Sequence, residues 1–214
     1  MRGRCWREPA AQPPWISRSA PKSASAAVGV HSCGFRQLTP TLKAEVEATR
    51  AGEIERLPEV LLFGAGHVGR ALAAALAPLP LSVTVVETRQ EELANLPAAT
   101  KTRLVPMPEA LVKDIAAGGA AVILTHDHAL DFLIAREALA REDLAYTGMI
   151  GSATKRATLA SWLSREGGER AWMERLTLPI GGSAVRDKRP EVIAAMTAAE
   201  ILTALAAYRL HASS

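Results

Sequence analysis

Short apolar runs alternate with amphipathic segments along most of this chain, from Pro58 onward. The apolar runs are rich in β-branched residues, which is typical of strands covered on both faces. Strands are predicted at residues 60–64, 82–87, 102–106, 121–126 and 145–151. Helices are predicted at 67–77, 107–117, 129–141 and 152–166, with a weaker helix near 90–95 and a final helix after Pro190. This alternation requires crossover connections, so it predicts a doubly wound, mostly parallel α/β sheet of the Rossmann type over residues 58–210.

The first part of the chain lacks this periodicity. Residues 1–40 are rich in Pro, Ser and Ala and hold six basic side chains against one acidic side chain, whereas the whole chain of 214 residues has a net charge of only +3. We expect residues 1–40 to form a disordered or atypical extension, with a targeting segment as the alternative, and residues 41–57 to form a linker or a short helix. Because the positive charge is concentrated in the extension, it does not indicate nucleic-acid binding by the folded part.

Cysteine usage and hydropathy both indicate a cytoplasmic protein. Cys5 and Cys33 form no CxxC motif and have no paired spacing, which favours a reducing compartment. No uninterrupted apolar run approaches the roughly 18 residues that cross a bilayer, so we expect no membrane segment.

A glycine-rich motif lies at the first junction between strand and helix. Gly64, Gly66 and Gly69 form G-x-G-x-x-G, and Glu87 ends the next predicted strand, near the distance at which an acid meets a ribose hydroxyl in dinucleotide sites. The pattern in this position favours a nucleotide or another phosphate ligand. The alternative is a sheet that has the turn but binds no dinucleotide. His67, inside the loop, faces the same cleft or caps local backbone.

Two more segments follow predicted strands and should lie at the same edge of the sheet. In the first, His126, Asp127, His128 and Asp131 either contact a ligand or cap and pack the next helix, and no recognised metal-ligand spacing is complete. In the second, Ser152 is a suitable N-cap, but Lys155 and Arg156 stand in the first helical turn, where the helix dipole disfavours cations. A second basic group, Arg186, Lys188 and Arg189, precedes the last helix, which favours a shared anionic ligand over solvent-facing charges.

Together these motifs resemble one family. The set FGAGHVG, VVETR, THDHALD, YTGMIGS with its following Lys, and LPIG with a later K and PE is similar to the C-terminal Rossmann domain of the xanthine dehydrogenase accessory proteins, the XdhC/CoxI family. The similarity covers roughly residues 58–205. The chain departs from the family at its N-terminal end, where nothing matches the cysteine-containing segment of the type SGGCVE.

The resemblance implies a maturation factor of purine catabolism rather than a metabolic enzyme. Such a chaperone binds the molybdenum cofactor, holds it while a cysteine desulfurase installs the terminal sulfur, and delivers it to apo xanthine dehydrogenase. By motif, Gly64, Gly66, His67 and Gly69 would line the phosphate end of a cleft. His126, Asp127, His128 and Asp131 would lie at its mouth, and Gly151, Ser152 and Lys155 would form an anion-facing turn.

Two other functions remain open at this stage. The glycine loop and Glu87 also fit an NAD(P)-dependent oxidoreductase, in which His126 would be the candidate general acid, or an NAD(H)-sensing regulatory domain. No pair of nucleophile and base is evident in the sequence, so we predict no catalytic residue. The apolar final helix, EVIAAMTAAEILTALAAY, is a candidate surface for a homodimer.

Overall fold

The computed structural model describes residues 57–182 and 184–212. The predicted N-terminal extension at 1–40 lies outside the described residues, and so does the predicted linker or short helix at 41–57 except for Leu57. The described part contains a six-stranded sheet in which every neighbouring pair of strands is parallel. The predicted fold class, a doubly wound and mostly parallel α/β sheet, is confirmed.

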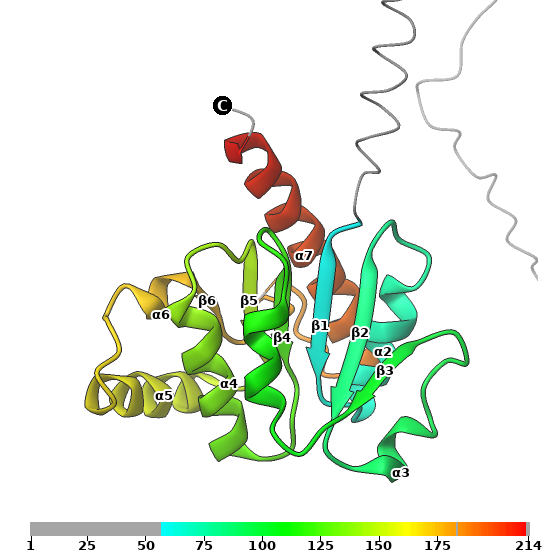
Figure 1. The fold of residues 1–214 in the computed structure, drawn as a ribbon, viewed down its shortest axis with the longest axis horizontal. Coiled ribbons are helices and arrows are strands. Elements are labelled where there is room, and N and C mark those ends of the chain that lie inside the picture. Colours follow the sequence, from blue (N-terminus) through cyan, green and yellow to red (C-terminus); the bar gives the residue numbers. More distant parts are fainter. Residues whose placement is uncertain (1–56, 183, 213–214) are drawn as a thin grey trace, which may run out of the picture. The chain divides into compact units, whose positions relative to one another are not determined.

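The strands run side by side in one direction (Figure 1). They are β1 (Glu59–Phe63), β2 (Ser82–Glu87), β3 (Lys101–Leu104), β4 (Ala120–Ile123), β5 (Tyr146–Met149) and β6 (Leu176–Thr177). Their order across the sheet is β3-β2-β1-β4-β5-β6. One half of the sheet thus consists of β1, β2 and β3, from the centre outward, and the other half consists of β4, β5 and β6, again from the centre outward. The reversal between β1 and β4 is the switch point, beyond which open α/β sheets bind their ligands.

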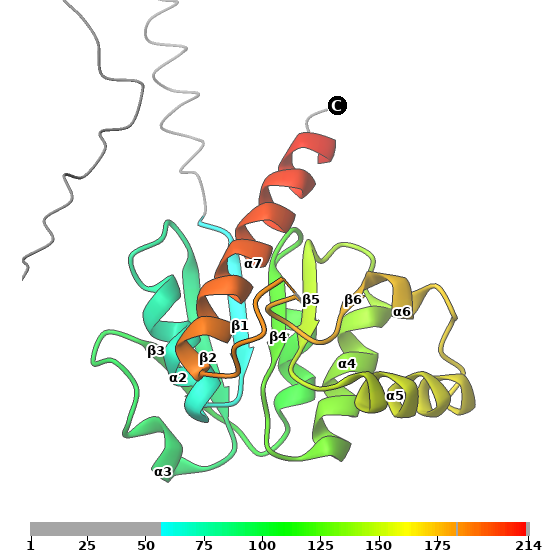
Figure 2. The same cartoon turned by 180° about the vertical axis from the view of Figure 1, so that it is seen from behind.

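Helices cover both faces of the sheet, as the two opposite views show (Figures 1 and 2). On one face, α2 (His67–Leu76) packs against α7 (Pro190–Ala212). On the other face lie α4 (His128–Ala140), α5 (Ala153–Arg165) and the 3-10 helix η1 (Pro108–Asp114). Two short helices, α3 (Gln90–Leu93) and α6 (Trp172–Arg175), lie in the connections.

The core consists of two layers because neighbouring residues of a strand point to opposite faces. In β1, Leu61 and Phe63 pack into the layer under α4 and α5, whereas Val60 and Leu62 pack into the layer under α2 and α7. This explains why β1 is apolar from Val60 to Phe63. A strand buried on both faces has no polar side.

The structure corrects several details of the predicted elements. All four residues of β3 are exposed, although we expected each strand to be covered on both faces, because β3 lies at the edge of the sheet. The helix predicted at 107–117 is the shorter 3-10 helix η1 at Pro108–Asp114. The helix α6 and the two-residue strand β6 were not predicted, since elements this short carry no periodicity.

The final helix α7 meets the length and mean hydropathy of a membrane span, with a mean hydropathy of 1.4 over its best window. A core helix of a soluble protein meets the same criteria, so this is a weak indication. One side of α7 is buried in the layer shared with α2, through Ala194, Thr197, Ala198, Ile201 and Leu205. These positions recur every three or four residues, as expected for a helix that covers a sheet.

Candidate functional site

The predicted site residues gather at the carboxyl edge of the sheet. The glycine loop follows β1, Glu87 ends β2, Thr125–Asp131 follows β4, and Gly151–Arg156 follows β5. Because all strands are parallel, these segments emerge on the same side of the sheet. The glycine loop and the Thr125–Asp131 segment flank the switch point, since β1 and β4 are neighbours whose helices lie on opposite faces.

Two glycines of the loop are required by packing. Gly64 has a φ of 118°, and a Cβ there would lie 2.5 Å from the Leu124 carbonyl oxygen. A Cβ at Gly69 would lie 2.1 Å from the Gly64 carbonyl oxygen. These contacts match the roles of the first glycine in a tight turn and of the third in close packing of helix on strand.

Gly66 differs from both. Its φ of −64° and ψ of −172° suit any residue, and a Cβ there would meet no atom within 4 Å. As the N-cap of α2 it offers no side-chain cap, although Ser, Thr, Asp or Asn would stabilise a helix here by about a few tenths of a kcal/mol relative to Gly. Neither backbone conformation nor packing demands glycine, so this residue keeps the space beside the first amides of α2 open. Such a space suits a phosphate.

Glu87 stabilises the glycine loop through a hydrogen bond. Its side chain is 5% exposed. One carboxylate oxygen accepts from the Ala65 N–H at 2.9 Å, and the other accepts from the N–H groups of Thr88 at 2.9 Å and Arg89 at 3.2 Å. Burial favours the neutral acid, but these three N–H groups stabilise the carboxylate more, so the pKa of Glu87 is lowered from its ordinary value.

The role of Glu87 can be checked by its pH dependence. Because the pKa is lower in the folded protein than in the unfolded chain, the stabilisation is fully present above the ordinary pKa of 4.5 and is lost as the pH falls through the folded-state value. We expect Glu87→Gln to lower the free energy of unfolding by about 2 kcal/mol at pH 7. Urea unfolding of both proteins from pH 7 to pH 3 should show this difference shrinking. A difference that stays constant over that range would contradict the assignment.

The segment after β4 divides into an exposed part and a buried part. His126, Asp127 and His128 are exposed, whereas Asp131 is completely buried. Asp127 is the N-cap of α4, and its carboxylate accepts from the N–H of Ala129 at 2.8 Å. Within residues 57–182 and 184–212, no group of three His, Cys, Asp or Glu side chains is placed to hold a metal ion. A ligand contact by the two histidines stays a prediction.

The two cations of the first turn of α5 have protein partners. Ser152 caps this turn by accepting from the Lys155 N–H at 3.3 Å. The Lys155 ammonium is paired with Asp131 and donates to the Ile150 carbonyl at 3.0 Å. The Arg156 guanidinium donates to the carbonyl oxygens of Leu176 at 3.0 Å, Leu178 at 3.3 Å and Met173. Both cations therefore have a structural role, and their predicted contact with the cofactor has no direct support in this geometry.

The second basic group, before α7, is exposed. Arg189 pairs with Asp187 at 2.7 Å, and hydrogen bonding to this guanidinium lowers the pKa of Asp187. Arg186 and Lys188 have no hydrogen bond or ion pair within the described part of the chain.

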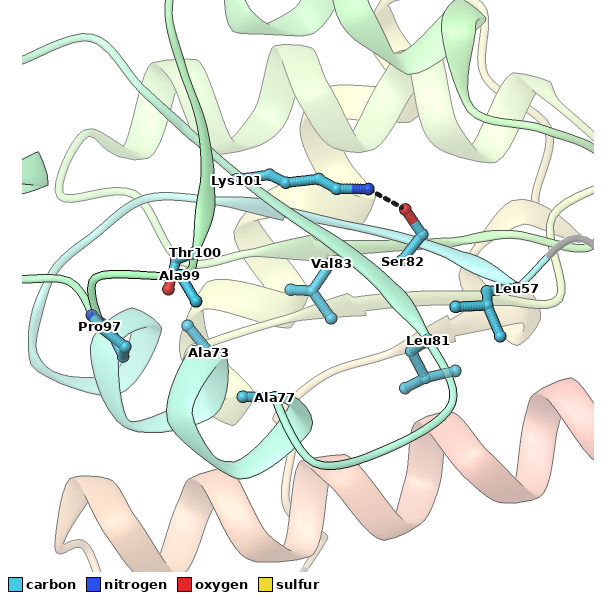
Figure 3. A pocket seen from close by; sticks show the side chains of 10 residues that line it. All are labelled: Leu57, Ala73, Ala77, Leu81, Ser82, Val83, Pro97, Ala99, Thr100 and Lys101. Atoms are coloured by element: carbon cyan, nitrogen blue, oxygen red, sulfur yellow. Dashed lines mark hydrogen bonds between the residues drawn. The ribbon is translucent and has the colours of Figure 1, made fainter.

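A cleft of about 630 Å³ runs along α2, from His67 to Ala75. His67 and Arg70 line it on one side, and Pro190 and Glu191, the first residues of α7, line it on another. The starts of two helices therefore border one hollow, and its lining holds charges of both signs, Arg70 and Glu191. Another hollow, drawn in Figure 3, is mostly apolar, and its Lys101 ammonium is bonded to Ser82 at 3.1 Å. It lies by the C-terminal end of α2 and the start of β2, away from the glycine loop.

Sequence reasoning missed two hydrogen-bonding residues, Thr125 at this edge and Glu200 on α7. Thr125 donates from its N–H at 3.2 Å and from its hydroxyl at 2.6 Å to Asp131. Glu200, on α7, accepts from the Tyr146 hydroxyl at 2.8 Å and from the Gly181 N–H at 3.1 Å. Burial and the Glu200 carboxylate raise the pKa of Tyr146 above its usual range. A glutamate inside the apolar sequence of the last helix was the available signal for this contact.

Comparison with known proteins agrees with this geometry. The model of the XdhC Rossmann domain matches residues 60–201. The fold is similar to that of a crystal structure described as a xanthine dehydrogenase from Bacillus halodurans, with a TM-score of 0.59 and 21% sequence identity. The similarity covers 71% of this chain and 43% of that chain, so this chain spans less than half the length of that neighbour. No curated protein matches the chain.

The family match extends over the same part of the chain as the motifs quoted above, from the glycine loop into the last helix. The resemblance that the sequence suggested is therefore confirmed. The chain belongs to the XdhC family through its Rossmann domain.

Proposed function

We propose that this protein binds the molybdenum cofactor and serves as an accessory protein in the maturation of xanthine dehydrogenase. The observation that carries the proposal is the open space at Gly66, beside the uncapped start of α2 and next to the switch point of the sheet. The cofactor bears a phosphate, and backbone N–H groups at a helix start bind phosphate well. Membership in the XdhC family supports the choice of this ligand among phosphate-bearing molecules.

The residues present fit the phosphate end of the cofactor. Gly64 and Gly69 fix the conformation of the loop, and Gly66 leaves room for the phosphate. The backbone N–H groups at the start of α2 would donate to the phosphate. His67 and Arg70 line the adjacent cleft. When bound, the cofactor would supply the molybdenum centre that the target enzyme needs. The role of this chain would be to hold and shield it until transfer to apo xanthine dehydrogenase, with a cysteine desulfurase as the second partner.

Glu87 bears on the choice between this ligand and NAD(P). In dinucleotide sites the acid at the end of the second strand accepts from the ribose hydroxyls. Here the carboxylate is 5% exposed, and both oxygens already accept from backbone N–H groups. A ribose hydroxyl therefore has little access to the remaining acceptor site of this carboxylate. This favours a ligand that places no ribose at Glu87. It disfavours the two functions that need NAD(P) or NAD(H), an oxidoreductase and an NAD(H) sensor.

The proposal is tested by the small molecule that the protein carries. The chain is expressed in a host that makes the molybdenum cofactor, purified without oxygen and denatured, and the released ligand is identified by fluorescence and mass. We expect near-stoichiometric pterin from the wild type and at least tenfold less from Gly66→Val, whose side chain would fill the phosphate space. Its free energy of unfolding should change by no more than about 1 kcal/mol.

Ser164→Val, which adds a similar side chain at an exposed position of α5, is the matched control and should retain the pterin. Recovery of NAD(P) without pterin would favour the sensor or the oxidoreductase. A wild-type protein that carries no pterin and takes up none would contradict the proposal.

A further inference from the structure

Asp131 and Lys155 form a buried ion pair between two neighbouring junctions of the sheet. Asp131 lies in the first turn of α4, after β4, and its side chain is 0% exposed. Lys155 lies in the first turn of α5, after β5, and its side chain is 9% exposed. Because β4 and β5 are adjacent, the pair spans the carboxyl ends of two neighbouring strands.

Each partner of the pair is also bonded to the end of a strand. Asp131 accepts from the N–H and the hydroxyl of Thr125, just beyond β4, while its other oxygen accepts from Lys155. Lys155 donates to the carbonyl oxygen of Ile150, just beyond β5. The four residues thus form one network that connects the two junctions.

This network argues against direct ligand contact by either charge. For Lys155 to bind an anion, its ammonium would have to leave Asp131, and a fully buried carboxylate would lose its cation. Leaving a buried charge unpaired is strongly unfavourable. The polar side chains of the two junctions that face solvent instead include His126, Asp127, His128 and Ser152.

We propose that Asp131 and Lys155 are a positioning pair. They fix the exposed segment His126–His128 relative to the turn Gly151–Ser152, and they act on a bound ligand only through these two segments. The ligand in question is that of the proposed function, on which the binding readout rests. The pair therefore sets the width of the site between β4 and β5 without lining it.

Four proteins separate positioning from contact: the wild type, Asp131→Asn, Lys155→Met, and the neutral pair Asp131→Asn/Lys155→Met. The probe is molybdenum cofactor released without oxygen from purified xanthine dehydrogenase, and the fraction retained by the protein is measured by pterin fluorescence. We expect Asp131→Asn and Lys155→Met each to bind at least tenfold more weakly, because each removes the same link between the junctions. The neutral pair should bind no more weakly than the single variants, since the link can be lost only once. Wild-type binding by Asp131→Asn, which keeps the ammonium, together with weak binding by Lys155→Met would mean that Lys155 contacts the ligand.

Hydrogen exchange of the protein without ligand gives a second readout, independent of the cofactor. In Lys155→Met, we expect faster exchange at Thr125–Asp131 as well as at Ile150–Arg156, and the conservative Asp131→Asn should change both segments in the same way. Faster exchange confined to the substituted junction would overturn the positioning role. Lys188→Met, at an exposed lysine, is the control and should change neither segment.

Cofactor retention and hydrogen exchange test the two proposals independently. If the exchange of both segments is coupled but the wild type retains no cofactor, the positioning pair stands and the proposed ligand is wrong. If the wild type retains cofactor but exchange is uncoupled, the ligand stands and the pair does not position the junctions.

Discussion

Gly69→Ala is expected to lower the free energy of unfolding by about 3 kcal/mol or more, at the upper end of the range for overpacked sites. The added methyl group would lie 2.1 Å from the Gly64 carbonyl oxygen. The methyl group would be attached directly to the backbone of α2, and the carbonyl belongs to the backbone of the loop. Since neighbouring structure fixes both backbones, no flexible side chain can move aside. The first turn of α2 would have to shift away from β1. Urea denaturation at neutral pH measures this loss directly.

Gly66→Ala is the matched control, because it makes the same chemical change three residues earlier in the same loop. A Cβ at Gly66 meets no atom within 4 Å, and its backbone conformation is ordinary. We expect its stability to stay within about 1 kcal/mol of the wild type. Equal stabilities for Gly69→Ala and Gly66→Ala would mean that the loop does not approach α2 as closely as described.

Lys155→Met is expected to cost about 3–5 kcal/mol of stability, the range for breaking a buried ion pair by removing one partner. The cost arises because Asp131, with an exposure of 0%, would lose its cationic partner in a buried site. The neutral pair Asp131→Asn/Lys155→Met should recover most of this loss. Thermal and urea unfolding of the three proteins provide the comparison.

Lys188→Met is the control for the loss of a positive charge as such. Lys188 is exposed and makes no hydrogen bond or ion pair within the described residues, so the change should stay within about 0.5 kcal/mol. If Lys155→Met were as mild as Lys188→Met, the ion pair would contribute little, and its role would be limited to geometry.

The order and type of the long elements could be predicted from the sequence because one signal dominates them. Strand β2 has the predicted bounds, and α2, α4 and α5 differ from prediction by one residue at their ends. In these segments, burial on both faces or on one face imposes an apolar pattern that is visible without any tertiary information. The exposed β3 and the short β6 lack that pattern, since their place in the sheet depends on neighbours that are distant in sequence.

The position of the candidate site could be predicted from the sequence, but the contacts of its residues could not. Its position follows from parallel strands, whose carboxyl ends share one edge. The partners of its charged residues do not follow, because a sequence does not show that Glu87 meets the Ala65 N–H or that Lys155 meets Asp131. Cations at a helix start suggested an anion, and for Lys155 the anion found is a carboxylate of the protein itself. Arg156 instead binds backbone carbonyls.

The two edges of the sheet avoid pairing with other chains by different means. An exposed edge strand presents unpaired backbone groups that can recruit a further strand and start aggregation. At one edge, β3 places the cations Lys101 and Arg103 among four exposed residues, and charge on an edge disfavours the approach of another strand. At the other edge, β6 is only two residues long, too short to act as a template. The sheet is thereby kept from growing into a polymer by strand addition at either edge.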